Sequence, residues 1–334
     1  MPYCDYKAPE VCRQIARRIL EGDNFLMVPH QNIDGDDLGC MLAFGAVLKK
    51  LGKKYCLYSA DGTPVSFRFL QNHREIVTEL PEDVHFDTAI VLECLQYSRL
   101  SGGVKLYELC DHVVSLDHHP ESKQNDVKSE LAWIDPSFCA LGEMLYFVFR
   151  EMNAELDKTA AEALYTSMVS DSAGFRYSSV SSRTHRAIAH LVDIIGDISH
   201  IHRHIFGEKT LNEIKLFSLA SQTLRLHAGG RLVSAYYTKE MLDECGLEEN
   251  DTQTLISQLN VVRGTEIFAA FKQMKPGEVR VSLRSIRIPV NTVAYAHGGG
   301  GHNLAAACTL KGLTIEQAQA LILPELEALL NKEA

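Results

Sequence analysis

The sequence predicts an α/β protein: an N-terminal parallel-sheet domain with flanking helices, followed by a smaller C-terminal α/β domain. Short apolar runs first alternate with helix-length segments, as in βαβ units. After about residue 230, β-rich segments replace this alternation. The length of 334 residues also suits two domains. We therefore expect domains at 1–196 and 229–334, joined by a helical linker over 197–228.

The elements of the first domain follow from apolar spacing and segment length. Residues 8–21 carry Val11, Ile15 and Ile19 at helical spacing, which predicts an amphipathic helix. The run FLMVPH at 25–30 is too short for a helix and is typical of a buried strand. Three further runs have the same character, at 53–60, 88–95 and 112–119. Helices are predicted at 38–52, 138–152, 158–171 and 183–195.

The second domain is predicted from β-rich segments and a closing helix. The predicted strands are 231–240, 265–274 and 277–286, with Lys-Pro-Gly as the turn between the last two. A glycine run at 298–301 precedes NLAAAC (303–308), which we interpret as a helix of small residues. The final helix is predicted over 314–332.

Composition and charge exclude some classes of function and indicate a cellular compartment. The net charge of −10, from 33 Lys and Arg against 43 Asp and Glu, disfavours a protein that holds long nucleic acid. The nine cysteines include no Cys-x-x-Cys pair, as expected for reduced core thiols. We find no signal-peptide pattern and no apolar stretch near the roughly 18 residues of a membrane span. These features predict a cytoplasmic protein without a membrane partner.

The first polar cluster follows the predicted strand at 25–30 and contains His30, Asp34, Asp36 and Asp37. Carboxylates beside an imidazole suit a divalent cation such as Mn²⁺, Mg²⁺, Fe²⁺ or Zn²⁺. The alternative is a simple turn, because Asp-Gly is a common turn dipeptide and Asp36 could cap the next helix. From these residues alone, both interpretations stay open.

Two more polar clusters end predicted elements. Asp117, His118 and His119 end a strand, where a pair of histidines by itself is more often structural than part of a site. Asp171 ends the helix at 158–171, where the helix dipole disfavours a carboxylate and a cation would stabilise it. Carboxylates that converge in one cleft repel each other, and two divalent cations about 3.5–4 Å apart would remove that cost. Such a pair of cations is typical of phosphoester hydrolysis.

Three motifs together resemble a known family. HxNxDGDxLG at 30–39, VVSLDHHP at 113–120 and GGGGHNLAAA at 298–307 are similar to those of the DHH phosphoesterases with their associated C-terminal domain. The nanoRNase type is the most similar subtype, and the resemblance spans nearly the whole chain. It implies an enzyme that degrades very short oligonucleotides or dephosphorylates 3′-phosphoadenosine phosphate, with the active-site cleft between the two domains.

The resemblance also implies individual roles. The implied metal ligands are His30, Asp34, Asp36, Glu93, His118 and Asp171. In this family the first two hold one metal, and Glu93 occupies the position that bridges to the second. Asp117 and His119 are the implied catalytic residues, with His119 near the scissile phosphate. The expected cofactor is two Mn²⁺ ions, with Mg²⁺ or another divalent cation as the alternative.

The sequence departs from the family at three places, one of which is Asp171-Ser172-Ala173, where the family has Asp-Thr-Gly. Glu93 stands where the family has aspartate, so its longer side chain either bridges both metals or reaches only one. Cys139-Ala140-Leu141 replaces Ser-Ser-Thr, so the hydroxyls that would cap the next helix are missing. Two functions follow: a metal-dependent phosphodiesterase or phosphatase, or a catalytically impaired nucleotide-binding regulatory protein of the same fold.

The second domain is expected to bind substrate. The predicted contacts are Arg284, Ser285, Gly299, Gly300, Gly301 and His302, with Arg99 and Arg263 in supporting positions. Glycine N–H groups and a helix N-terminus favour phosphate, although a flexible turn is the alternative. The expected partner is a short oligonucleotide or a nucleotide. Whether the protein is a monomer or a homodimer is left open.

Overall fold

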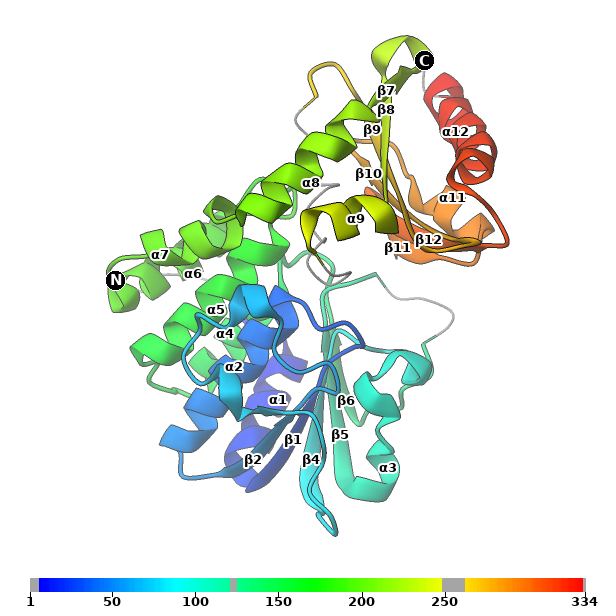
Figure 1. The fold of residues 1–334 in the computed structure, drawn as a ribbon. Helices are drawn as coiled ribbons and strands as arrows, with labels where there is room; N and C mark the ends of the chain where they lie inside the picture. Colours follow the sequence, from blue (N-terminus) through cyan, green and yellow to red (C-terminus); the bar gives the residue numbers. More distant parts are fainter. Residues whose placement is uncertain (1–5, 121–124, 248–261, 333–334) are drawn as a thin grey trace. The chain divides into compact units, whose positions relative to one another are not determined.

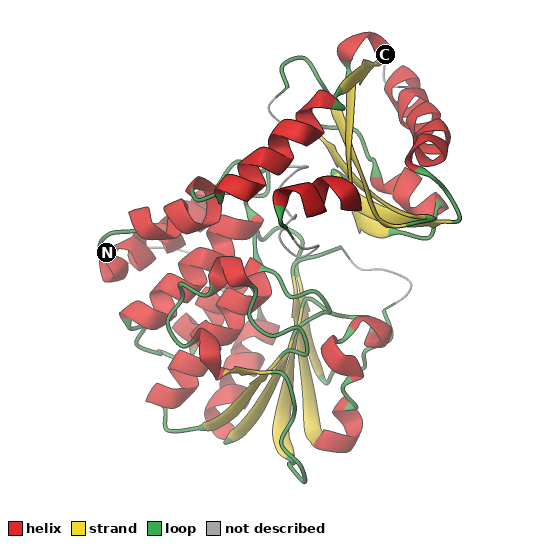
Figure 2. Ribbon diagram, viewed as in Figure 1, coloured by secondary structure: helices red, strands yellow, loops and turns green. Residues whose placement is uncertain are grey.

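A computed structural model describes residues 6–120, 125–247 and 262–332, without the side chains of Met274 and His302. The chain divides into two compact units, Met1–Glu208 and Lys209–Ala334, which we call the first and second unit. Each unit contains a sheet covered by helices (Figures 1 and 2). The division falls inside the segment assigned to a linker from the sequence.

The first unit is built on the predicted parallel sheet. Its strands are β1 (Asn24–Val28), β2 (Lys54–Tyr58), β3 (Ile76–Val77), β4 (Phe86–Leu92), β5 (Cys110–Asp117) and β6 (Leu131–Ile134). They lie in the order β3-β2-β1-β4-β5-β6, and every neighbouring pair is parallel. The two edge strands, β3 and β6, are absent from the sequence prediction.

Helices cover both faces of this sheet. They are α1 (Glu10–Glu21), α2 (Gly35–Lys50), α3 (Leu106–Leu109), α4 (Leu141–Glu151), α5 (Lys158–Asp171), α6 (Ser182–Ile195) and α7 (Ser199–His202). A π-helical turn follows at Arg203–Gly207. Along β1, Phe25 and Met27 join the core under α1, α2, α4 and α5, while Leu26 and Val28 join a smaller core on the opposite face. Burial on both faces explains why the strand is a continuous apolar run.

The second unit has its own sheet and core. Its strands are β7 (Arg225–His227), β8 (Leu232–Thr238), β9 (Ile267–Lys275), β10 (Glu278–Ser285), β11 (Gly300–His302) and β12 (Ala305–Lys311), in the order β11-β12-β10-β9-β8-β7. Only the β8–β9 pair is parallel. The described helices are α8 (Leu211–Gln222), α9 (Lys239–Cys245), α11 (Asn291–Ala296) and α12 (Ile315–Lys332). Across both units, no described helix has the length and hydropathy needed to cross a membrane.

The prediction of a helix at 303–308 is wrong, because most of this segment belongs to β12. Residues Ala306, Cys308 and Leu310 are buried in alternation with more exposed neighbours, which is the period of a strand. The small residues serve close approach to β11. A Cβ atom on Gly299 would lie 2.1 Å from the carbonyl oxygen of Ala307, so a larger residue would not fit there.

Candidate metal centre

The predicted ligands gather at the carboxyl ends of three neighbouring strands. β1 leads to His30, β4 leads to Glu93, and β5 leads to His118. The strand order reverses between β1 and β4, and in parallel sheets such a switch point opens a binding crevice at this edge. The topology therefore brings together residues that are far apart in the sequence.

A first group contains His30, Asp34, Asp37 and Glu93, whose ligand atoms all lie within 4.8 Å of one another. The Nε2 atom of His30 lies 3.2 Å from Oδ2 of Asp37 and 4.0 Å from Oδ2 of Asp34. The Oδ1 atom of Asp34 accepts the N–H groups of Asp36 and Asp37 and so caps α2. The alternative that Asp36 caps this helix is therefore wrong, and Asp34 both caps α2 and faces the cluster.

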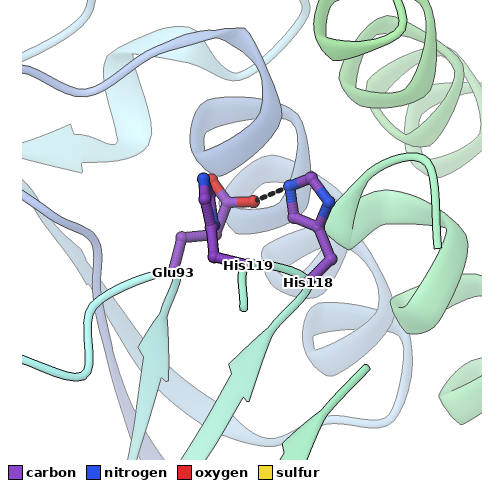
Figure 3. A group of neighbouring side chains, drawn as sticks. All are labelled: Glu93, His118 and His119. Carbon is purple, nitrogen blue, oxygen red and sulfur yellow. Dashed lines mark ion pairs between the residues drawn. The ribbon is translucent and has the colours of Figure 1, made fainter. Parts of the chain in front are cut away.

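A second group contains Asp36, His118 and Asp171. The Nε2 atom of His118 lies 3.6 Å from Oδ2 of Asp36 and 3.5 Å from Oδ2 of Asp171. It also lies 2.8 Å from Oε1 of Glu93, and Figure 3 shows this carboxylate facing the imidazole ring. Glu93 thus belongs to the first group and contacts the second.

The surroundings of His118 favour its neutral form. Its Nδ1 atom lies 3.3 Å from the carbonyl oxygen of Phe138, and a proton on Nδ1 directs the Nε2 lone pair toward the carboxylates. Burial of the ring lowers the pKa of His118. Both effects favour the form of the imidazole that binds a metal.

His119 is oriented by its neighbour Asp117. The Oδ1 atom of the buried Asp117 accepts the backbone N–H of His119 at 2.8 Å and lies 2.8 Å from Nδ1 of the ring. His119 also forms a potential ligand group with Glu93 and His118 (Figure 3). Asp117 therefore fixes the direction of His119 at the edge of the cluster.

Asp36 replaces the helix cap that the sequence lacks. Ala140 precedes α4 and makes no side-chain cap, but the carboxylate of Asp36 accepts the N–H groups of Leu141 at 2.6 Å and Gly142 at 3.1 Å. It also accepts the hydroxyl of Ser167 at 2.5 Å. The cap hydroxyl is therefore missing, as the sequence indicates, and a carboxylate from another helix accepts the N–H groups in its place.

Five acidic residues form a carboxylate-rich cluster: Asp34, Asp36, Asp37, Glu93 and Asp171. None of these five forms an ion pair with Lys or Arg within the described parts of the chain. Burial, and then the neighbouring carboxylates, raise the pKa values of Glu93 and Asp171 well above their ordinary ranges. Carboxylate oxygens with imidazole nitrogens are ligands that Mn²⁺ and related divalent ions accept. The residues present therefore fit divalent cations.

Glu93 has an unusual backbone conformation. Its φ of 50° lies in the left-handed region, which is uncommon for a residue with a long side chain. The Glu93 N–H donates to the carbonyl oxygen of Leu116 at 3.0 Å, which fixes the residue against the end of β5. Such strain persists where the surroundings impose it, and it clusters at functional sites.

The sequence places Asp37 in the first polar cluster, but the ligand set that the family resemblance implies does not include it. Ser167, which donates to Asp36, has no predicted role. The signal for Asp37 was the almost wholly apolar segment 38–48. A helix that is apolar on all sides is buried on all sides, so a carboxylate in its first turn is buried too. No sequence signal pointed to Ser167, whose partner Asp36 lies on another helix.

The predicted substrate-binding residues of the second unit lie on two strands. Half-buried Arg284 in β10 pairs with Ala305 of β12, which pairs in turn with His302 of β11. Backbone register therefore places Arg284 and His302 in one row of the sheet; the side chain of His302 lies outside the described atoms. Ser285 accepts the N–H of Ile288 and closes a turn. Gly300 and Gly301 belong to β11, Gly299 comes directly before it, and the run leads into a strand where a helix was predicted.

The two supporting arginines lie in different units. Arg99 and Arg263 are both exposed. The carbonyl oxygen of Arg99 accepts the N–H of Gln31 at 2.8 Å, so its turn lies against the residue that follows His30. Arg263 lies just before β9 in the second unit.

Comparison with protein families accounts for both units. Residues 24–168 match the DHH family, N-terminal domain, and residues 232–332 match the DHHA1 domain. The chain belongs to the DHH family. This DHH-family chain is 24% identical to a bifunctional oligoribonuclease and PAP phosphatase NrnA of Bacillus subtilis, over 89% of its length and 92% of the relative. It is 27% identical to the protein of the same name from Thermus thermophilus, over 92% and 90% of the two chains.

A solved structure supports the fold of this DHH-family chain. An exopolyphosphatase-related protein from Bacteroides fragilis matches with a TM-score of 0.86 and 18% identity, over 97% of this chain and 98% of that one. The resemblance to the DHH family that the motifs indicated is therefore confirmed, and so is the mixed α/β architecture. The family and the named relatives support a hydrolase that acts on phosphoesters.

Proposed function

We propose that the protein is a metal-dependent phosphoesterase that hydrolyses dinucleotides such as pApA, other very short oligonucleotides, 3′-phosphoadenosine phosphate, or several of these. The observation that carries this proposal is the convergence of five carboxylates and three histidines at one edge of the first sheet. The names of the relatives from Bacillus subtilis and Thermus thermophilus support the same substrate classes.

The proposed ligands are His30, Asp34 and Glu93 for one cation, and Asp36, His118 and Asp171 for the other, with Mn²⁺ as the expected ion. When bound, such cations offset phosphate charge and make water a stronger nucleophile near neutral pH. Phe138 holds the His118 ring with Nε2 toward the ligand position. The Oδ1 atom of Asp117 lies 2.8 Å from Nδ1 of His119 and orients this ring, which would contact a phosphate oxygen of the substrate.

We further propose that Arg284, Ser285, His302 and residues 299–301 bind a part of the substrate remote from the reacting phosphate. A guanidinium offers two parallel donors to a phosphate, and backbone without Cβ atoms permits close approach. Arg99, beside the His30 loop, would contact phosphate nearer the metals. The negative net charge of the chain is compatible with a phosphate substrate, because the cations would offset that charge locally and the substrate is very short.

The test is release of mononucleotide from pApA with and without Mn²⁺. We expect activity in the unmodified protein, and a loss of at least about 100-fold in Asp34→Ala and His118→Ala, because each removes a metal ligand. Asp111→Asn serves as the control, since Asp111 is exposed and lies at the opposite end of β5. Full activity in both ligand variants would disprove the proposal. Nucleotide binding without turnover would instead favour the impaired regulatory protein.

A further inference from the structure

Asp37 is a buried carboxylate that the proposed ligand set does not include. It lies in the first turn of α2, and its side chain is fully buried at 0% exposure. The described residues give neither carboxylate oxygen a hydrogen bond of normal geometry, and the backbone N–H of His30 is a weak donor to it. A buried carboxylate with so little hydrogen bonding is strongly disfavoured, so its environment in the working protein should contain a cation.

The contact between Asp37 and His30 points to the same conclusion. The Nδ1 atom of His30 lies 2.7 Å from the carbonyl oxygen of Gln31, which places the ring proton on Nδ1. The Nε2 lone pair then faces Oδ2 of Asp37 at 3.2 Å. That separation is expected of two ligands that each lie about 2.0–2.2 Å from one shared divalent ion.

Charge distinguishes the two ligand groups. The first group contains three carboxylates and one histidine when Asp37 is included, whereas the second contains two carboxylates and one histidine. A more anionic set of oxygen ligands binds a hard divalent cation more tightly. We propose that Asp37 is a ligand of the cation held by His30, Asp34 and Glu93, and that it makes this the tighter of two cation sites. The inference rests on the proposed function, which requires both cations.

The experiment is a calorimetric titration of the metal-free full chain with Mn²⁺, on the unmodified protein and on Asp37→Asn. Asparagine keeps the shape of the side chain but removes its charge. We expect two binding phases in the unmodified protein, and a tighter phase weakened by roughly 10–100-fold in the variant. His118→Ala should weaken the other phase. Asp111→Asn, which removes an exposed carboxylate far from the cluster, should change neither.

Thermal melting provides a second readout that does not depend on activity. Asp37→Asn should raise the melting temperature of the metal-free protein, because it removes one of several acidic groups buried close together. It should also reduce the increase that Mn²⁺ produces. If Asp37 only pairs with His30 as a structural group, the Mn²⁺ titration stays unchanged, and that result would overturn the inference. Asp37→Ser provides the same comparison should the first variant fold poorly.

Turnover of pApA by the same preparations separates this inference from the proposed function. An active unmodified protein with an unchanged Asp37→Asn titration would overturn the role of Asp37 alone. An inactive protein whose tight phase depends on Asp37 would overturn the proposed function and support the ligand assignment. A protein that binds no Mn²⁺ would overturn both.

Discussion

Asp36 has a structural task in addition to its proposed place at the metals. Its carboxylate accepts from two N–H groups at the start of α4 and from the hydroxyl of Ser167. Unlike Asp37, it is therefore well supplied with donors in the metal-free protein. In the metal-free protein, substitution of Asp36 should therefore lower the stability, whereas substitution of Asp37 should raise it.

We predict that Asp36→Ala lowers the free energy of unfolding of the metal-free protein by about 1–3 kcal/mol, because buried donors lose their acceptor. Urea denaturation in the presence of a chelator measures this change. Asp111→Ala, at an exposed site, should differ from the unmodified protein by no more than about 0.5 kcal/mol. A variant as stable as the unmodified protein would show that α4 does not depend on this cap.

The sequence could identify many of these residues but not their contacts. The motifs predicted the six ligand positions because residue types and order are visible in one dimension. The link between Asp36 and α4 joins residues 105 positions apart, so no local pattern reports it. The left-handed conformation of Glu93 is equally invisible, because it follows from the packing of β4 against β5.

Among the secondary-structure elements, α2 and α5 approach each other closely at Gly39. A Cβ atom on Gly39 would lie 2.5 Å from the carbonyl oxygen of Ala163 and 2.8 Å from Cβ of Ser167. Backbone cannot move aside as the end of a flexible side chain can. Both helices carry proposed ligands, so their separation also sets the geometry of the cluster.

We predict that Gly39→Ala lowers the free energy of unfolding by about 1–3 kcal/mol through overpacking. Denaturant titration of the metal-free protein tests this. Gly207→Ala is a matched control, because its Cβ would lie 3.6 Å from the nearest atom, an ordinary contact distance. Equal stability of the two variants would contradict the prediction.

The elements also show where reasoning from sequence fails. Long segments such as α5 and the apolar central strands were predictable because periodicity and length separate helix from strand. The segment 303–308 was not, since small apolar residues suit either state and only pairing with β10 and β11 selects the strand. The four-residue β6 is too short to give a periodic signal.

For the whole molecule, the two units have separate cores and carry different proposed sites. The first carries the carboxylate-rich cluster, while the second carries the glycine strand and Arg284. We predict two unfolding transitions by scanning calorimetry of the full chain, of which Mn²⁺ raises only one, because a ligand stabilises the unit that binds it. Gly39→Ala should lower the same transition. A single transition that moves as a whole would show that the units unfold together.

The raised pKa values of the clustered carboxyls have a consequence for metal uptake. In the metal-free protein, Glu93, Asp37 and Asp171 retain protons at pH values where ordinary carboxyls have lost them, chiefly because they are buried. A cation must displace those protons in order to bind, so uptake is an exchange reaction. Apparent affinity for the ion should therefore rise with pH across the mildly acidic range, and acidification alone should release the metal from a chain that is still folded.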